Sequence, residues 1–412
     1  MPATPTAPGN LTPFIRAQES LYGPITTIPD PAQWTPPAQS GGHRGRYLWT
    51  DAFGVLNFLT LHRETSLNHQ AQNQPQHQPQ PQPPQKDHYL TLATTLITTV
   101  HRTLGTTRAA PSTPLPRATP THPLAGGLRI GKPHAHGPDA DGQYHHYLTL
   151  WMFALNRTAV ATGDRTWNDQ AVALARAIHP HFVRGGGSGS GSGGGPHHPP
   201  RMVWKMDVDL AQVLVAAEGN LDPVDGWVVF RLLRATDRWL RRREDHQEPE
   251  DELLEGEMED YRRIIVQRKG AGFVSQDPLD LGMAMWTAHW LADAKGEEEW
   301  AGRMAGDCWA RVDELFERRH FLDHDLRERL AFREFGTCLG LRCMAEQSDK
   351  DRAVELKSYA ERIVECWDPY VWMETGCNAT PEELRPITRV MYAAALIPGA
   401  FCRGYFGPEP IA

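Results

Sequence analysis

Two kinds of apolar segment alternate along this chain. The segment that begins near residue 143 carries apolar side chains on nearly every side, which is typical of a buried helix. The next segment, residues 165 to 180, places its apolar residues on one side of a helical wheel, which predicts a helix with one solvated face. Segments of the first kind begin near residues 47, 143, 204, 279, 330 and 387, and segments of the second kind near residues 87, 165, 225, 297 and 351.

This alternation predicts an all-α fold with two concentric layers. Six buried helices would form an inner ring and about six amphipathic helices would cover it, as in an (α/α)6 toroid of helical hairpins. We expect one barrel domain over residues 46–405, after an irregular N-terminal arm at 1–45 and before a short tail at 406–412. The Gln/Pro-rich residues 66–86 and the Gly/Ser-rich residues 185–200 cannot form a core, so they are predicted to be disordered insertions.

Charged, histidine and aromatic residues gather where the chain enters the apolar segments. The clearest case is the loop at residues 126–142, which holds Arg129, Lys132, Asp139 and Asp141 just before a buried helix. The turns that leave the apolar segments are short and carry few such residues, apart from the Gln/Pro-rich insertion. We therefore expect a polar rim at one end of the toroid, where a functional site would form.

Four segments resemble one family within the six-hairpin glycosidase-like superfamily. They are WTDAF at 49–53, GGLRIGKP at 126–133, DGQYHHYLTLWM at 141–152 and WKMDVDL at 204–210, and the similarity spans roughly residues 45–405. The resemblance implies the (α/α)6 fold and a site at the end where the inner helices begin. It also implies sugar chemistry, because the superfamily includes glycoside hydrolases, uronyl hydrolases and sugar epimerases or isomerases. It assigns no catalytic residue in this chain.

Carboxylates near the starts of the apolar segments are the candidates for acid/base catalysis. Asp51, Asp141 and Asp207 lie at or near such starts, and Glu334 interrupts the fifth apolar segment. A pair of carboxylates can act as acid and base when their surroundings separate their pKa values. Each also has a structural interpretation as a helix cap, a turn or an ion pair. Asp277, which precedes a proline, is expected to be such a cap.

Aromatic and basic residues near the same rim are predicted to bind the substrate. The chain has 13 tryptophans, and their flat, amphipathic rings suit the faces of sugars. Basic residues at the rim could bind an anionic substrate through a carboxylate or phosphate, or could pair with the aspartates there. The predicted substrate-binding residues are Trp49, Arg129, Lys132, Tyr144, His145, His146, Trp204, Lys205, Asp280, Trp286 and Arg333.

The composition of the chain excludes some classes of binding partner and indicates the cellular compartment. The formal net charge of −8 argues against a nucleic acid or an anionic membrane as partner. No run approaches the ~18 apolar residues of a membrane-spanning helix, and the N-terminus lacks the features of a secretory signal, so a cytoplasmic protein is expected. The histidines at 134–146 lack the i, i+4 spacing of helical metal ligands, so neither a metal nor a cofactor is predicted.

We therefore expect a carbohydrate-active enzyme that acts on a small-molecule or oligosaccharide substrate, and in the first place a glycoside hydrolase with paired carboxylates. The alternative is a sugar epimerase or isomerase on the same barrel, in which His145, His146 and His289 would move protons next to a carbonyl. A further alternative is a sugar-binding protein without catalysis. The product separates these hypotheses: a free reducing end, an isomer, or none.

Overall fold

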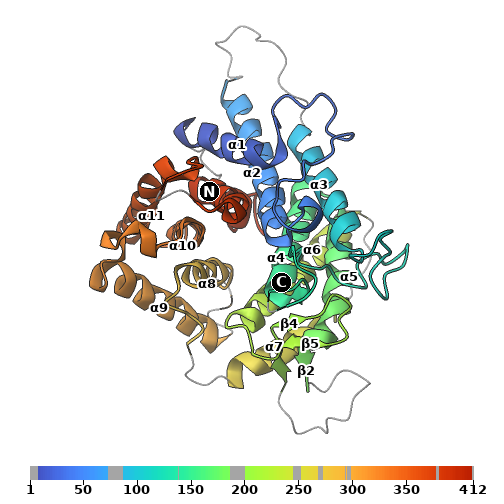
Figure 1. The fold of residues 1–412 in the computed structure, drawn as a ribbon. Helices are drawn as coiled ribbons and strands as arrows, with labels where there is room; N and C mark the ends of the chain where they lie inside the picture. Colours follow the sequence, from blue (N-terminus) through green and yellow to red (C-terminus); the bar gives the residue numbers. More distant parts are fainter. Residues whose placement is uncertain are drawn as a thin grey trace.

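The computed structural model describes residues 8–72, 87–137, 139–185, 200–244, 252–267, 272–292, 294, 298–376 and 380–410. Within these residues, twelve α-helices form two concentric rings, and the chain runs once around them, as the colours of Figure 1 show. The inner helices stand side by side, and the outer helices cover them. The (α/α)6 fold predicted from the alternation of segments is confirmed.

The inner ring is closed, because each of its helices contacts the next one and the last contacts the first. Apolar residues surround these helices, as in α4, where every residue from Leu148 to Ala159 is buried. The inner helices are α2 (Leu48–Gln72), α4 (His145–Thr162), α6 (Asp222–Glu244), α8 (Pro278–Trp290), α10 (Ala331–Ala345) and α12 (Arg385–Leu396).

Each outer helix packs against an inner neighbour through one apolar face. In α5, for example, Ala171, Leu174 and Ile178 are buried at helical spacing, and Asp164 caps the first turn by accepting from the amide of Thr166. The outer helices are α1 (Pro8–Tyr22), α3 (His88–Leu104), α5 (Arg165–Phe182), α7 (Glu255–Gln267), α9 (Glu299–Asp313) and α11 (Lys350–Val371).

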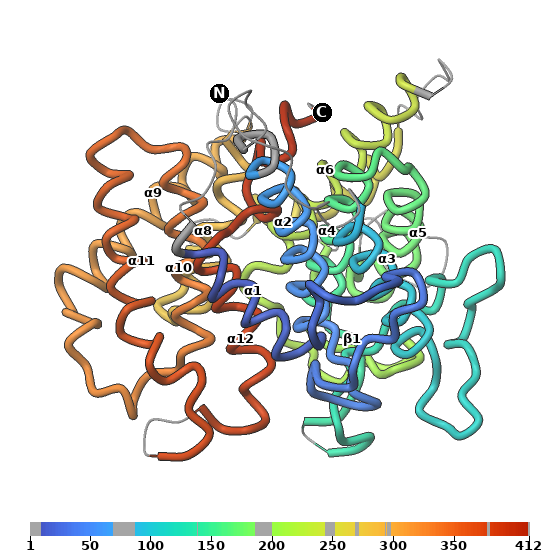
Figure 2. The backbone as a smooth tube through the Cα atoms, turned by 90° about the horizontal axis from the view of Figure 1, so that it is seen from above, coloured from blue at the N-terminus to red at the C-terminus, as the bar shows by residue number. Residues whose placement is uncertain are grey.

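Short strands lie at the end of the ring where the inner helices begin, as Figure 2 shows for β1. A three-stranded antiparallel sheet joins β1 (Gln143–Tyr144) to β4 (Lys205–Met206) and β4 to β5 (Val213–Val215). The pairing sets Tyr144 opposite Lys205. A second sheet pairs β2 (Val183–Arg184) with β3 (Arg201–Met202). The first sheet holds the hairpin of β4 and β5 beside the start of α4.

The third inner helix is not the one that the sequence predicted. The apolar segment at 204–218 forms β4, β5 and their turn, and the predicted outer segment near 225 is the inner helix α6. Its outer partner is α7, a helix that the pattern of apolar segments did not predict. The arm at 1–45, predicted to be irregular, contains the outer helix α1. These predictions were wrong because the apolar content of a single segment does not show which other segments pack against it.

The predicted insertions fall mostly outside the described residues. Helix α2 continues through the first part of the Gln/Pro-rich region as far as Gln72, and residues 73–86 and 186–199 are not among those described. None of the described helices is both long enough and apolar enough to span a membrane.

Candidate active site

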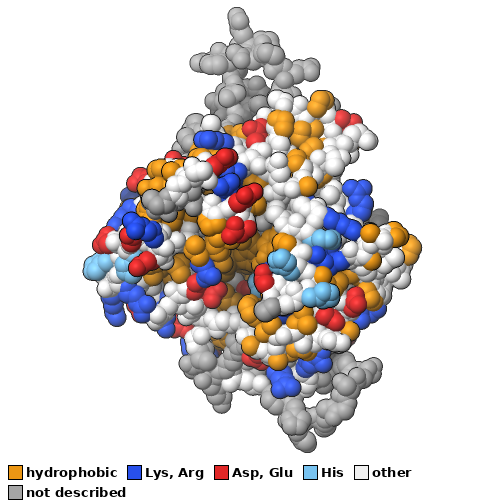
Figure 3. Space-filling model, viewed as in Figure 1, with side chains coloured by type: hydrophobic (Ala, Val, Ile, Leu, Met, Phe, Trp, Pro, Cys, Tyr) orange, Lys and Arg blue, Asp and Glu red, His pale blue; other side chains and the backbone are white. Residues whose placement is uncertain are grey.

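A cavity of about 550 Å³ opens where the six inner helices begin. Figure 3 shows this face hollowed at its centre, with hydrophobic side chains inside and charged side chains and histidines around the margin. All six inner helices contribute to the lining, so the cavity lies on the axis of the toroid. Its polar and aromatic lining includes Trp49 of α2, His146 and Tyr147 of α4, Asp222 and Asp225 of α6, Asp280 and Trp286 of α8, Arg333 of α10, and Lys132 and Trp204 from the preceding loops.

Aromatic side chains line part of this cavity, and Tyr144, which was predicted to bind substrate, stacks against two of them without lining the cavity itself. Trp204, just before β4, stacks on Tyr144 with ring centroids 5.4 Å apart and an angle of 12° between the planes. Tyr144 stacks in turn on His146 at 5.5 Å and 15°. Trp204 keeps 38% of its surface exposed, whereas Trp49 and Trp286 are buried in the cavity wall. Flat rings with one open face suit the apolar face of a sugar.

Two carboxylates enter the cavity from the first turns of α6. Asp222 opens the helix, and Asp225 follows one turn later on the same side. Asp225 is 7% exposed and accepts a hydrogen bond of 2.7 Å from the hydroxyl of Thr287 on α8. Burial raises the pKa of Asp225 to about 7. This carboxyl group can therefore exist in both protonation states near neutral pH.

His146 is the histidine of α4 that faces the cavity. Its Nδ1 accepts a hydrogen bond of 3.2 Å from the indole N–H of Trp204 and lies 3.7 Å from a carboxylate oxygen of Asp222. Burial lowers the pKa of His146 to about 3, so the imidazole is neutral at pH 7. A neutral imidazole that lines the same cavity as a carboxyl group of raised pKa, Asp225, gives the cavity two groups suited to acid/base chemistry.

The charged residues at the margin of the cavity already have partners. Arg333 pairs with Asp277, and Lys132 pairs with Asp139. Asp277 also caps α8 by accepting from the amides of Leu279 and Asp280, as predicted. Burial raises the pKa of Asp280, and the negative charge of Asp277 adds to this effect. Asp280 is thus a third carboxyl group in the cavity lining, besides Asp222 and Asp225.

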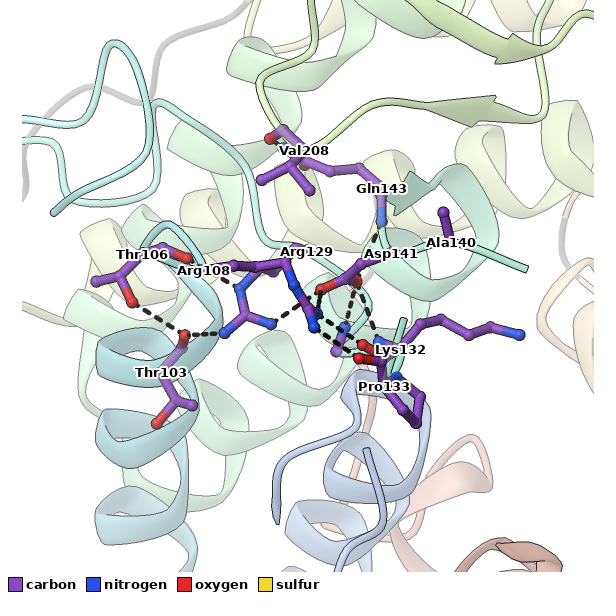
Figure 4. A network of polar contacts seen from close by, with 12 residues as sticks. Thr103, Thr106, Arg108, Arg129, Lys132, Pro133, Ala140, Asp141, Gln143 and Val208 are labelled. Carbon is purple, nitrogen blue, oxygen red and sulfur yellow. Dashed lines mark hydrogen bonds and ion pairs between the residues drawn. The ribbon is translucent and has the colours of Figure 1, made fainter. Parts of the chain in front are cut away.

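Asp141 lies in a network of basic groups outside the cavity (Figure 4). One of its oxygens accepts from Arg108 at 2.8 Å and from Arg129 at 3.0 Å. The other accepts from the amides of Gly131, Lys132 and Gly142 at 2.8 to 3.1 Å. With five donors and only 2% exposure, this carboxylate holds the loop before α4 in place. Arg129, predicted to bind substrate, pairs with Asp141 in this network and does not line the cavity.

That loop also ties α4 to the start of α2. The carbonyl of Ile130 accepts from the amide of Leu48, and the carbonyl of Gly131 accepts from the amide of His43. Gly131 has a φ of +89°, and a Cβ there would lie 2.3 Å from the carbonyl oxygen of Arg46. Only glycine fits this approach. The loop therefore fixes the relative positions of two inner helices at the mouth of the cavity.

Asp51 and Glu334 lie outside the cavity lining and hold ion pairs in the helical rings. Asp51 is fully buried and accepts from Ser40 at 2.6 Å, Tyr22 at 3.1 Å and Arg46 at 3.2 Å. Burial raises the pKa of Asp51, although Arg46 opposes this shift. Glu334 accepts two hydrogen bonds, of 2.6 and 2.9 Å, from one arginine, Arg329. Asp51 and Glu334 therefore form buried ion pairs that stabilise the fold.

Asp207 and Lys205 fall in a segment that the pattern predicts to be a buried helix, but they lie in the hairpin of β4 and β5. Asp207 accepts from the amide of Ala211 at 2.7 Å and so closes the turn. Lys205 is 2% exposed, donates to the carbonyl of Ala140 and lies 5.0 Å from the ring centroid of Tyr144. Burial lowers the pKa of this lysine. Neither residue lines the cavity, so the structure does not bring the four predicted catalytic carboxylates together.

His145 and His289 also point away from the cavity. Consecutive helical residues diverge by about 100°, and His145 bonds through Nε2 to Tyr261 of α7 at 2.8 Å. His289 is 1% exposed, and its Nε2 accepts from the amide of Arg403 at 3.1 Å. Burial lowers the pKa of each to about 3. The proposed histidine set is therefore reduced to His146.

The structure brings seven of the predicted binding residues to the cavity and adds two carboxylates that the sequence reasoning missed. The seven are Trp49, Lys132, His146, Trp204, Asp280, Trp286 and Arg333. Asp222 and Asp225 were missed because α6 was assigned to the outer layer. One signal could have found them: Asp222 precedes a proline and a run of apolar residues, as Asp277 does at the start of α8.

Among the described residues, no group of three or more His, Cys, Asp or Glu side chains is arranged to hold a metal ion. The cavity lining offers three carboxyl groups, one neutral imidazole and several aromatic rings.

No protein-family model matches this chain, and no curated protein matches it in sequence. The fold is similar to that of a cellobiose 2-epimerase from Bacillus thermoamylovorans B4167, with 10% identity and a TM-score of 0.51 over 94% of this chain and 99% of that one. A sugar epimerase from a ruminal bacterium aligns with 10% identity and a TM-score of 0.47 over 93% and 98% of the two chains. At this identity the first similarity concerns the fold alone, and it supports the (α/α)6 barrel that the resemblance implied.

Proposed function

We propose that this protein is a sugar epimerase or isomerase that moves a proton at a carbon next to a carbonyl. The observation that carries the proposal is that Asp225 and His146 line the same cavity and are both shifted toward their neutral forms. One is a carboxyl group whose pKa burial raises to about 7, and the other is an imidazole whose pKa burial lowers to about 3. Both line one cavity at the end of the toroid where the inner helices begin.

The reaction requires a base and a proton donor on the same sugar. A base removes the proton from C2 of the open-chain aldose, and the electron pair of that bond moves to the carbonyl oxygen at C1. The resulting enediolate takes a proton back at C2 to give the epimer, or at C1 to give the ketose. A general base works best with a pKa near the working pH, which Asp225 meets. Asp280, which lines the cavity from the neighbouring inner helix α8, is a candidate for the second proton transfer.

The cavity also suits a sugar in size and surface. Its volume of about 550 Å³ falls within the range of small-molecule sites. The open face of Trp204 and the buried Trp49 and Trp286 offer apolar surface, and the carboxyl groups offer acceptors for hydroxyl groups. The cellobiose 2-epimerase with the same fold supports a sugar substrate at this position.

Proton exchange with solvent tests the proposal directly. The protein is incubated in D₂O with glucose, mannose, N-acetylglucosamine, glucuronate and cellobiose, and each sugar is followed by ¹H NMR. We expect one of them to lose its C2 proton signal and to yield an epimer or a ketose. Asp225→Asn and His146→Asn should abolish the exchange, and Asp207→Ala should retain it. If no sugar of the panel exchanges C2 or isomerises, the proposal is wrong.

A glycoside hydrolase is the second candidate, because Asp222, Asp225 and Asp280 place three carboxyl groups around one cavity. Hydrolysis needs one carboxylic acid to protonate the glycosidic oxygen and one carboxylate to activate water or attack carbon. The same NMR experiment separates the two candidates when cellobiose is present. A hydrolase releases glucose without deuterium at carbon, whereas an epimerase leaves the glycosidic bond intact.

A further inference from the structure

Trp204 makes a contact with His146 that determines which ring nitrogen carries a proton. The indole N–H can only donate, so the Nδ1 that lies 3.2 Å from it must accept with its lone pair. A neutral imidazole holds one proton, and burial keeps His146 neutral at pH 7. That proton must therefore sit on Nε2.

Asp222 competes for the same nitrogen. If Nδ1 carried the proton, it would donate to the carboxylate of Asp222 and the indole N–H would lose its acceptor. The distances decide between these partners: 3.2 Å to the indole nitrogen lies within the usual limit for a hydrogen bond, and 3.7 Å to the carboxylate oxygen does not. The geometry thus favours Trp204 as the partner of Nδ1.

The other ring nitrogen is left for the substrate. Nε2 of His146 contacts no polar group of the described residues, and the side chain keeps 24% of its surface exposed while lining the cavity. An N–H at this position can donate to the oxygen of a bound sugar, whereas a lone pair there would accept a proton from it.

We propose that Trp204 is a positioning residue that locks His146 as the Nε2–H tautomer, so that His146 acts as the hydrogen-bond donor to the carbonyl oxygen and Asp225 acts as the base. The inference rests on the proposed epimerase or isomerase function for its catalytic half. Its structural half, the tautomer of His146, depends only on the hydrogen bond from Trp204. A neutral imidazole that donates to a developing enediolate stabilises charge without giving up its proton in the ground state.

The stack of Trp204 on Tyr144 keeps the indole in place for this contact. The pairing of β1 with β4 sets Tyr144 opposite Lys205, the residue that follows Trp204, and the two rings lie nearly parallel, at 12°. Replacing Trp204 with phenylalanine removes the N–H but keeps an aromatic ring for the stack. Trp204→Phe is therefore the variant that isolates the hydrogen bond.

The tautomer is measured by long-range ¹H–¹⁵N correlation spectra of the full-length protein labelled at histidine nitrogens, with His146 assigned by its absence in His146→Asn. We expect the wild-type protein to show a protonated Nε2 and an unprotonated Nδ1. In Trp204→Phe, Asp222 becomes the remaining partner of Nδ1, so the proton should move to Nδ1 or both nitrogens should be protonated. Trp286→Phe, which removes a cavity indole that donates to the carbonyl of Phe401, should leave the tautomer unchanged.

The kinetic readout is the turnover of whichever sugar the exchange experiment identifies. In Trp204→Phe, kcat should fall at least about tenfold, since one proton donor is lost from the transition state, while KM changes far less because the ring remains. A wild-type spectrum with Nδ1 protonated, an unchanged tautomer in Trp204→Phe, or a changed tautomer with unchanged kcat would each overturn the inference. If the wild-type protein turns over no sugar, the proposed function fails, and the spectra still decide the tautomer.

Discussion

Asp141 and Asp225 are both buried carboxylates near the start of an inner helix, yet their surroundings are opposite. Asp141 accepts hydrogen bonds from two arginine side chains and three backbone amides. Within the described residues, Asp225 accepts from one hydroxyl group, that of Thr287, and pairs with no arginine or lysine. Asp141 lies outside the cavity, and Asp225 lines it.

The difference separates a carboxylate that stabilises the fold, Asp141, from one that can exchange protons, Asp225. Arginines and amides offset the cost of burying the charge of Asp141, so that this carboxylate stabilises the loop before α4. The cost of burying Asp225 is offset only in part, by the hydrogen bond from Thr287, and the remainder appears as a pKa raised to about 7. A carboxyl group kept in this state reduces stability but can exchange protons at neutral pH.

The largest effect is expected for Asp225→Asn. The substitution removes the proton acceptor but keeps the shape of the side chain, so the rate of C2 exchange should fall by about 10²- to 10⁴-fold, the usual contribution of a general base. Asp141→Asn, assayed per folded molecule, should stay close to the wild-type rate. A comparable loss of rate in both variants would erase the distinction between the two carboxylates.

The next largest effect is a loss of stability in Asp141→Asn. Removing this charge leaves Arg108 and Arg129 without their shared partner, and breaking a buried pair costs about 3 to 5 kcal/mol. Urea denaturation followed by circular dichroism should show a lower midpoint than that of the wild-type protein. An unchanged midpoint would mean that the network of Figure 4 adds little to the fold.

The stability contribution of Asp225 should depend on pH. Its pKa is about 7 in the folded protein and 3.8 in the reference state, so the folded protein binds the extra proton between these values. Its contribution to stability is therefore present below pH 4 and is lost as the pH rises through 7. Asp225→Asn, which stays neutral, should exceed wild-type stability at pH 8 by about 4 kcal/mol.

The matched comparison is the same pair of proteins at about pH 3, where the carboxyl group is mostly protonated in both the folded and the unfolded state, so the two unfolding midpoints should agree. An Asp225→Asn variant that is less stable than the wild-type protein at pH 8 would show that this carboxylate is compensated by partners, as Asp141 is.

The smallest effect is expected for Asp207→Ala. Its side chain closes a turn through one hydrogen bond to the amide of Ala211, and losing such a bond costs about 1 kcal/mol. The rate should stay at the wild-type level, because Asp207 does not line the cavity. A large loss of rate would restore the catalytic role first predicted for this residue.

The ring of helices could be predicted because a helix buried on all sides has apolar residues on every face, and this pattern is visible within a single segment. Helix α4 is apolar all round, and the loop before it is polar, so both the helix and the site end of the barrel followed from residues 126 to 155. Helix α6 was misassigned because its last turns hold Arg241, Arg242 and Arg243 and look solvated, while its first turns are buried.

Which carboxylates are structural and which line the cavity could not be predicted, because the answer depends on partners distant in the chain. Arg108 lies 33 residues before Asp141, in a Pro/Thr-rich connection whose path no local pattern reveals. Thr287, the partner of Asp225, lies 62 residues away on another helix. His146 and Trp204 were identified as individual candidates, but their contact across 58 residues depends on the pairing of β1 with β4.

The most direct test of the central claim is a crystal structure of Asp225→Asn soaked with cellobiose, the disaccharide acted on by the enzyme of similar fold. The account predicts a sugar in the cavity between Trp204 and α6, with its C1 oxygen within hydrogen-bond distance of Nε2 of His146 and its C2 facing the carboxamide at position 225. A sugar bound elsewhere, with the cavity empty at a concentration that saturates the crystal, would contradict it.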